Sequence, residues 1–396
     1  MKAGMPQKTR EEFEESKKKM ENILINGLLQ YVKDGINPKY DNEKHMICYN
    51  IIYDFTDAGY GEDLLNFHNE KIGEATNECY ERIKDLSGLD FIDSFIDCTN
   101  KLNNLIFFMS RTFFYTSNNY LKGADDENNV RKYKEDNVSE FSMRIYKSLF
   151  FDKLEDKIYD SLNESLIREE RNGNKEYRTK IKTIMKTIQS MDFHKPKISK
   201  ISKTTTNWEE KGETNMMDYQ NRWFNKFKEE TKKYIKTKAE KDIMNKSAPE
   251  YVKCELKYLS EEDERLDSYV YGGYHQEIKD INYEYLIKDN AQTLFDMDTG
   301  IHNMFKNKKK DELSEIYQLF SFYPDSLRLI QESFKAYIKE RYLVLKNDIE
   351  LSKDPKKYET SIIELKKEME VIVATCFGNN NDFQEIANKE FSTLMG

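Results

Sequence analysis

Glycine and proline are scarce in this sequence. Its 396 residues include 15 glycines and 6 prolines, about 5% of the chain (21 of 396), against an average near ~12%. Turns between strands consume both residues, so the shortage disfavours a β-rich fold and favours long helices joined by short polar loops. The longest predicted loop is the segment 194–215, which is rich in lysine, serine and threonine.

Cysteine is also sparse, and long apolar runs are lacking. The five cysteines are scattered singly, without a CxxC pair or a small-domain disulfide framework: Cys48, Cys79, Cys98, Cys254 and Cys376. This usage indicates a reducing compartment. No uncharged apolar run approaches the ~20 residues needed to cross a bilayer, and the amino terminus lacks the apolar core of a signal peptide. We therefore expect a protein of the cytoplasm and nucleus.

Basic charge is not in excess, and catalytic motifs are missing. The net charge of −9 weighs against nucleic acid or an anionic membrane as the main partner. The five histidines lack HExxH spacing and are expected to be isolated surface or half-buried residues. Phosphate-cradling glycine motifs and GxSxG are absent. The sequence predicts no catalytic residue, no cofactor and no metal, so an enzyme is not expected.

Helical periodicity is what the sequence does contain. With 34% charged and 38% apolar residues, including 23 Phe and 26 Tyr, it has enough core material for folded amphipathic helices. Apolar residues recur at steps of three and four in 323–345, where Pro324 can start a helix, and in 360–380, which ends at a Gly-Asn-Asn cap signal. We predict an all-α fold whose helices form three blocks, a stack of bundles typical of a spacer or scaffold.

The segment "HMICYNIIYDF" (45–55) has too many apolar residues for one side of a helix. At about 100° per residue, one arc is the expected core face and contains Cys48, Ile51, Ile52 and Phe55. The adjoining arc contains His45, Met46, Tyr49 and Tyr53. Either both arcs are buried between neighbouring helices, or the second arc stays open to solvent and binds a partner, since Tyr and Met are favoured at interfaces.

Several longer motifs bear on this choice. "LIREERNGN" (166–174) resembles the cullin signature "LIxxERxGE", and "FMSRTFF" (108–114) resembles the cullin "YMDRxYV" segment. The stretches 215–269 and 312–341 also resemble cullin segments, and 45–55 resembles the second helix of the first cullin repeat. The motifs follow the order of the family over nearly the whole chain, which therefore resembles the amino-terminal half of the cullins, the scaffolds of multisubunit ubiquitin ligases.

This resemblance implies an architecture and a function. The expected fold is an elongated, α-solenoid-like stalk of three stacked five-helix cullin repeats: 1–155, which would bind the adaptor, 156–280 and 281–396. The carboxy-terminal RING-binding domain of cullins is expected to be absent from this chain. The implied function is that of a non-catalytic scaffold, which docks a substrate adaptor and holds it away from the RING module to position substrates for ubiquitination.

The resemblance also implies the docking residues. In cullins the exposed aromatic face of this helix docks the adaptor, a BTB-fold protein in several branches. His45 falls where the family usually has Tyr or Phe, Tyr49 and Tyr53 fall on tyrosines, and Met46 matches the branch that uses the adaptor of F-box proteins. The fifth helix, within 137–151, is expected to complete the groove with Val138 and Phe141, although core burial is an alternative for Phe141.

The implied partners are an F-box-type adaptor with its substrate receptor, and a cullin-associated exchange factor. A RING-box subunit would bind only through the missing carboxy-terminal domain. Neither nucleic acid nor a membrane is an expected partner. The alternative function is a helical-rod subunit of an exocyst-like vesicle-tethering complex, which shares stacked bundles. Such a rod would carry a basic membrane-binding tip, which the acidic balance of this chain disfavours.

Overall fold

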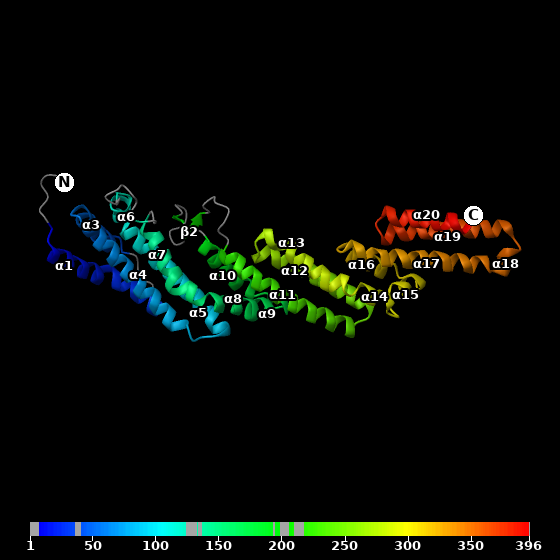
Figure 1. Ribbon diagram of the computed structural model, residues 1–396, viewed down its shortest axis with the longest axis horizontal. Coiled ribbons are helices and arrows are strands. Elements are labelled where there is room, and N and C mark those ends of the chain that lie inside the picture. Colours follow the sequence, from blue (N-terminus) through cyan, green and yellow to red (C-terminus); the bar gives the residue numbers. More distant parts are fainter. Residues whose placement is uncertain are drawn as a thin grey trace. The chain divides into compact units, whose positions relative to one another are not determined.

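The computed structural model (Figure 1) describes residues 8–35, 41–123, 133, 137–192, 195–198, 206–209 and 218–395. Helices account for nearly all of these ranges, which confirms the all-α prediction. The chain divides into two compact units, Met1–Phe224 and Asn225–Gly396, and the boundary falls within helix α11. Among the helices of the described ranges, none combines the length and apolar character that a bilayer crossing requires.

The first unit opens with two helices joined by a π-helical segment. α1 (Arg10–Met20) begins at a capping box in which Thr9 and Glu12 exchange hydrogen bonds. The π-helical segment Glu21–Ile25 leads into α2 (Asn26–Asp34), which ends at Gly35 in the left-handed conformation (φ 76°). The next helices are α3 (Asn42–Asp57), α4 (Gly61–Ile83), α5 (Gly88–Thr112) and α6 (Phe114–Asn119).

Gly61 explains how α4 can start close to the end of α6. A Cβ atom at this position would lie only 2.3 Å from Cγ of Tyr120, so no other residue fits without displacing that ring. After a 3₁₀ turn (Leu121–Gly123), α7 (Val138–Tyr146) packs against α4. It is followed by further helical segments: a π-helical segment (Lys147–Phe151), α8 (Asp152–Ser161), a second π-helical segment (Leu162–Ile167) and α9 (Arg168–Arg171).

The "LIREERNGN" motif turns the chain from α9 into α10 (Tyr177–Asp192). Leu166 and Ile167 are buried in the core, and Gly173 adopts the positive φ of 108° that this turn requires. Glu170 is fully buried, and its Oε1 accepts a hydrogen bond from Nε of Arg178 at 2.5 Å. The motif therefore ends one helix and anchors the next through a buried ion pair.

The predicted loop 194–215 contains a small hairpin, which corrects the sequence-based expectation. β1 (Lys195–Ile198) and β2 (Thr206–Glu209) pair in antiparallel register, with Pro196 opposite Trp208. Each strand has only four residues, and the first contains Pro196, a residue type that counts against a strand in sequence. The remaining residues of 194–215 lie outside the described ranges.

The second unit continues α11 (Asp218–Asn245) into an antiparallel partner, α12 (Ala248–Tyr269), which begins at a Ser247–Glu250 capping box. Two helices of this unit confirm the two predicted periodic helices. The first is α17 (Leu327–Lys346), which follows a 3₁₀ turn at Pro324. The second is α19 (Pro355–Cys376), which is followed by Gly378 at φ 58°. The other segments are a 3₁₀ turn (Gly272–Tyr274), α13 (His275–Tyr283), a π-helical segment (Glu284–Lys288), α14 (Ala291–Asp296), α15 (Ile301–Lys306), α16 (Lys310–Ser321), α18 (Ile349–Ser352) and α20 (Asn381–Met395).

An aromatic cluster forms the core of the carboxy-terminal helices. The rings of Phe377 and Phe383 lie 4.3 Å apart between centroids, and Phe334 packs at 5.8 Å from Phe377. Phe305 stacks on Phe334 at 5.7 Å. These contacts join α15, α17 and α20 around the end of α19, and the burial of four Phe side chains accounts for a large share of the stability there.

Candidate partner-binding site

Helix α3 presents two different faces. Its start is fixed by Asp41, whose side chain accepts hydrogen bonds from the backbone N–H groups of Glu43 and Lys44 at 3.0 and 3.2 Å. Cys48, Ile52 and Phe55 are buried, and Ile51 is half-buried. The first arc is therefore the core face, as the periodicity predicts.

The second arc of α3 lies at the surface and rests on α6. Met46 is 51% exposed, and His45, Tyr49 and Tyr53 are half-buried. The ring of Tyr115 on α6 lies 4.4 Å from the ring of Tyr53 and meets Tyr49 edge-on at 6.5 Å. Within the described part of the chain, these rings are supported from one side and open on the other. We call Met46, Tyr49, Tyr53 and Tyr115 the α3–α6 face.

A hydrogen bond holds the central ring of this face in place. The hydroxyl of Tyr115 donates to Oδ1 of Asp57, the last residue of α3, at 2.7 Å. The same helices are joined by the hydroxyls of Thr56 and Thr116, 3.1 Å apart. Because the Tyr115 ring is fixed before any partner arrives, little side-chain entropy remains to be lost on binding.

The surroundings shift the pKa values of Tyr115 in this face and of the neighbouring His45. The hydrogen bond to Asp57 raises the pKa of Tyr115 above its ordinary value. Partial burial, together with the nearby Arg111 guanidinium, lowers the pKa of His45 below its ordinary value. The α3–α6 face therefore offers flat, uncharged rings with polar edges, a surface suited to an apolar protein partner.

Val138 and Phe141 on α7 are not brought onto this face. Their side chains are only 1% and 2% exposed, which agrees with the core alternative for Phe141. The backbone N–H of Val138 donates to Oγ of Ser117 in α6 at 3.1 Å, and Tyr133 packs edge-on against the Phe141 ring. In this structure α7 supports α6 from the inside and offers little surface of its own there.

Tyr115 and Asp57 are the residues that the sequence analysis missed. Tyr115 directly follows the "FMSRTFF" motif, in a run of three aromatic residues at the end of a long helix. That run was the available signal, and Phe114 within it is 53% exposed. Asp57 carried no signal, because its role depends on how α6 packs against α3.

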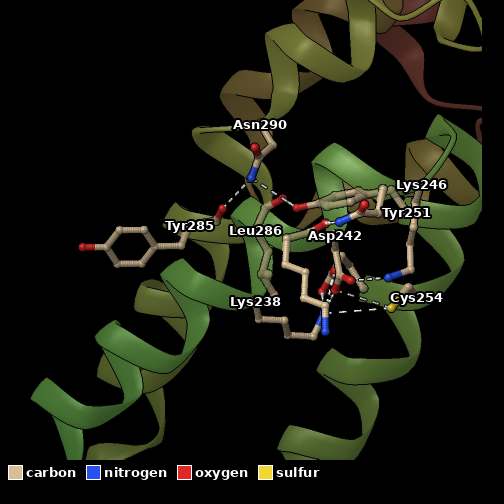
Figure 2. Close-up of polar contacts among 11 residues, drawn as sticks. Lys238, Asp242, Lys246, Tyr251, Cys254, Tyr285, Leu286 and Asn290 are labelled. Carbon is tan, nitrogen blue, oxygen red and sulfur yellow. Dashed lines mark hydrogen bonds and ion pairs between the residues drawn. The ribbon is translucent and has the colours of Figure 1, made fainter.

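A separate ionic cluster joins α11 to α12 in the second unit (Figure 2). Nζ of Lys238 donates to Oδ2 of Asp242 at 2.7 Å and to both carboxylate oxygens of Glu255 at 2.6 Å. Lys246 also donates to Asp242, and the thiol of Cys254 lies 3.8 Å from the same carboxylate. One ligand atom each from Asp242, Cys254 and Glu255 lies within 4.8 Å of the others, so the spacing alone would suit a metal ion.

The charges in this cluster favour an ion-pair network over a metal site. Burial opposes the charge of Lys238, but Glu255 and Asp242 outweigh burial and raise its pKa. Burial also opposes the charge of Asp242, yet the hydrogen bonds from Lys238 and Lys246 lower its pKa to about 2. Burial raises the pKa of Glu255 to about 7. A metal ion would have to displace two ammonium groups, so we interpret the cluster as a structural link between helices.

Comparisons with known proteins agree with the motif order. A family model described as "Cullin alpha solenoid domain" matches residues 16–396. Cullin-3A of Arabidopsis thaliana is 26% identical over 178 residues, covering 45% of this chain and 24% of that protein. Cullin-3 of Dictyostelium discoideum is 26% identical over 166 residues (42% and 22%), and Cullin-4A of Mus musculus is 21% identical over 170 residues (43% and 22%). The matched part corresponds to about a quarter of the length of these relatives.

Proposed function

The chain belongs to the cullin family, and on that premise we propose that it is a non-catalytic scaffold of a cullin-RING ubiquitin ligase, which docks a substrate adaptor through the α3–α6 face. The observation that carries the proposal is the half-open aromatic arc of α3. Met46 is 51% exposed, while Tyr49 and Tyr53 rest on the fixed Tyr115 ring. Aromatic anchors on a rigid helix contribute ~2 kcal/mol or more each when they lie at the centre of an interface.

The adaptor that we propose is the F-box type, a BTB-fold protein that carries a substrate receptor. Its support is Met46, which matches the cullin branch that uses this adaptor. The names of the relatives above specify no adaptor, so this choice depends on one residue. His45 stands where a larger aromatic ring is usual, and we expect it to bury less area in the complex than Tyr or Phe would.

The proposed mechanism is positioning. The three repeats, 1–155, 156–280 and 281–396, would hold the adaptor and receptor away from the RING module, so that a diffusive encounter is replaced by a tethered one. We propose that the RING-box subunit binds outside residues 1–396, that an exchange factor contacts the scaffold, and that the complex acts in cytoplasm and nucleus. A vesicle-tethering role is not favoured, because the family match over residues 16–396 is to cullins.

A calorimetric titration of the chain with purified F-box adaptor tests the docking face. We expect the double substitution Met46→Ala and Tyr49→Ala to weaken binding by at least ~2 kcal/mol, about 30-fold. The melting temperature should stay within a few degrees of the unaltered chain, because neither side chain is in the core. Asn50→Ala is the matched control, since Asn50 is exposed on the same helix, and it should bind as the unaltered chain does.

Three results would change the proposal in different ways. If the double variant binds as tightly as the unaltered chain, the α3–α6 face is not the docking site. If another BTB-fold adaptor binds more tightly than the F-box adaptor, and the double variant abolishes that binding, the face is correct and the branch is wrong. A large loss of stability, ~2–5 kcal/mol, would instead mean that Met46 and Tyr49 belong to the core.

A further inference from the structure

Two of the five cysteines meet between α4 and α5. Cys79 on α4 and Cys98 on α5 are both fully buried and are free thiols in this structure. One nitrogen of Arg82, Nη2, donates to Sγ of Cys98 at 3.0 Å and to Sγ of Cys79 at 3.8 Å. Both sulfurs therefore contact the same guanidinium nitrogen. The two cysteines are 19 positions apart in sequence, so the sequence analysis did not pair them. The turn between α4 and α5 brings them together.

The guanidinium of Arg82 is held firmly over the two sulfurs. Its other terminal nitrogen, Nη1, donates to the carbonyl oxygens of Val32 and Lys33, at 3.3 and 2.9 Å, near the end of α2. Asp97 lies 3.9 Å from Nη2 and is itself paired with Lys101 at 2.7 Å. The Arg82 side chain is 34% exposed, so its outer side faces solvent while its inner side faces the thiols.

These surroundings shift the pKa values of the two thiols in opposite directions. The neighbouring Cys79 thiol and the Arg82 guanidinium lower the pKa of Cys98 below its ordinary value, against the effect of burial. The neighbouring Cys98 thiol and burial raise the pKa of Cys79. By contrast, burial raises the pKa of Cys48 to about 11, and it also raises those of Cys254 and Cys376. Among the five, Cys98 alone has the lowered pKa of a reactive cysteine.

We propose that Cys79 and Cys98 form a redox-active dithiol, which hydrogen peroxide oxidises to an intramolecular disulfide between α4 and α5. The Cys98 thiolate attacks one peroxide oxygen, an S–O bond forms, the O–O bond breaks, and the leaving hydroxide is protonated to water. Cys79 then attacks the sulfenic sulfur, its proton leaves with the hydroxyl group as a second water, and the S–S bond forms. Two thiols and one peroxide thus become one disulfide and two waters.

The burial of the pair selects the oxidant. Both cysteines are 0% exposed and the Arg82 side chain over them is 34% exposed, so we expect an oxidant as small as hydrogen peroxide to react with them and glutathione disulfide to be excluded. Cys98 lies 13 positions before Arg111 on α5, so the two residues are ~20 Å apart along the helix. Arg111 is the residue of α5 that lies near His45. Oxidation should therefore leave the α3–α6 face intact, and this inference does not depend on adaptor binding.

The test is oxidation of the reduced, full 396-residue chain with hydrogen peroxide near neutral pH, followed by mass spectrometry of peptides without reduction. We expect a cross-linked peptide containing Cys79 and Cys98, lighter by two hydrogen atoms, while Cys48 and Cys376 remain alkylatable after unfolding. In Cys79→Ser, Cys98 should stop at the sulfenic acid and be trapped by dimedone when the chain is unfolded in its presence. In Cys98→Ser, Cys79 should stay reduced. Glutathione disulfide should react at least ~10-fold more slowly than peroxide.

Arg82→Met tests the source of the reactivity. Loss of the guanidinium should slow disulfide formation about 10-fold near neutral pH, because the thiolate fraction of Cys98 falls. Should this variant unfold, the unaltered chain gives the same information, since its rate of oxidation should rise with pH to a midpoint below the ~8.5 of a free cysteine. Reduced Cys79 and Cys98 after peroxide has oxidised Cys254 would overturn the proposal, as would a rate midpoint near the ordinary value of a free cysteine, ~8.5.

Discussion

At the scale of single residues, His68 on α4 is a histidine without exposure to water. It is fully buried, its Nδ1 lies 3.0 Å from Oδ1 of Asn69, and its Nε2 lies 3.3 Å from Oγ of Ser142. Its ring also packs edge-on against Phe113, with centroids 5.1 Å apart. Burial lowers the pKa of His68 to about 4, so the ring is neutral at pH 7.

This lowered pKa predicts a loss of stability in mild acid. Between the unfolded value, ~6.5, and about 4, the unfolded chain binds a proton that the folded chain does not. The free energy of unfolding should therefore fall as the pH drops through this window, by up to about 3 kcal/mol. Urea unfolding at about pH 7 and about pH 4.5 measures the change. His68→Gln should show a clearly smaller difference, and an equal difference would contradict the assignment.

The sequence did not predict the burial of His68, and the reason for this applies to several other residues. The expected surface or half-buried position was wrong, because whether a polar residue on a helix is buried depends on the neighbouring helix, here α7 with Ser142. The same holds for Cys79 and Cys98, which are 19 positions apart in sequence. Whether such residues are buried or paired depends on tertiary packing, and helical periodicity within one segment carries no information about it.

At the scale of elements, the apolar periodicity of the sequence predicted more of the structure. The two arcs of α3 could be read from periodicity, because Cys48, Ile52 and Phe55 recur at steps of three and four, with Met46 and Tyr49 on the adjoining side. The docking role of the second arc stays a prediction. What the pattern omitted is the support from α6, since the hydrogen bond between Tyr115 and Asp57 joins residues 58 positions apart.

His45 on this helix predicts that adaptor binding depends on pH. The pKa of His45 is already lowered by partial burial and by Arg111, and docking would bury the ring further. A protonated ring opposes that burial, so affinity should be lower at pH ~5.5 than at pH ~7.5, because the pH then falls below the ordinary histidine value of ~6.5. Calorimetric titrations at both values measure this.

His45→Phe is the matched variant for this effect, since it restores the larger ring that is usual in the family and cannot titrate. It should bind more tightly than the unaltered chain and lose most of the pH dependence. An unchanged pH dependence in His45→Phe would place the titrating group on the adaptor instead.

At the scale of the whole molecule, the order of the motifs was the strongest signal. No single motif is specific, yet their sequence along the chain predicted the family that the match over residues 16–396 supports. The proposed division into three repeats stays a prediction, and the structure itself has two compact units, Met1–Phe224 and Asn225–Gly396. Unit boundaries depend on contacts between distant helices, whereas the motifs report only on short segments.

The two units lead to a prediction that separates stability from binding. Lys238→Met in the second unit keeps the aliphatic stem but leaves Asp242 and Glu255 without their shared ammonium. Removing one partner of a buried pair should lower the free energy of unfolding by about 3 kcal/mol. Lys236→Met, an exposed position on the same helix, should change it by less than ~0.5 kcal/mol. Thermal and urea unfolding measure both.

The same Lys238→Met variant should bind the adaptor normally, within about twofold, when titrated at a temperature at which it is folded, because every residue of the α3–α6 face belongs to the first unit. The double variant at Met46 and Tyr49 should behave in the opposite way, with weak binding and normal stability. If Lys238→Met weakened adaptor binding while folded, the adaptor site would have to include the second unit, and a docking face confined to α3 and α6 would be wrong.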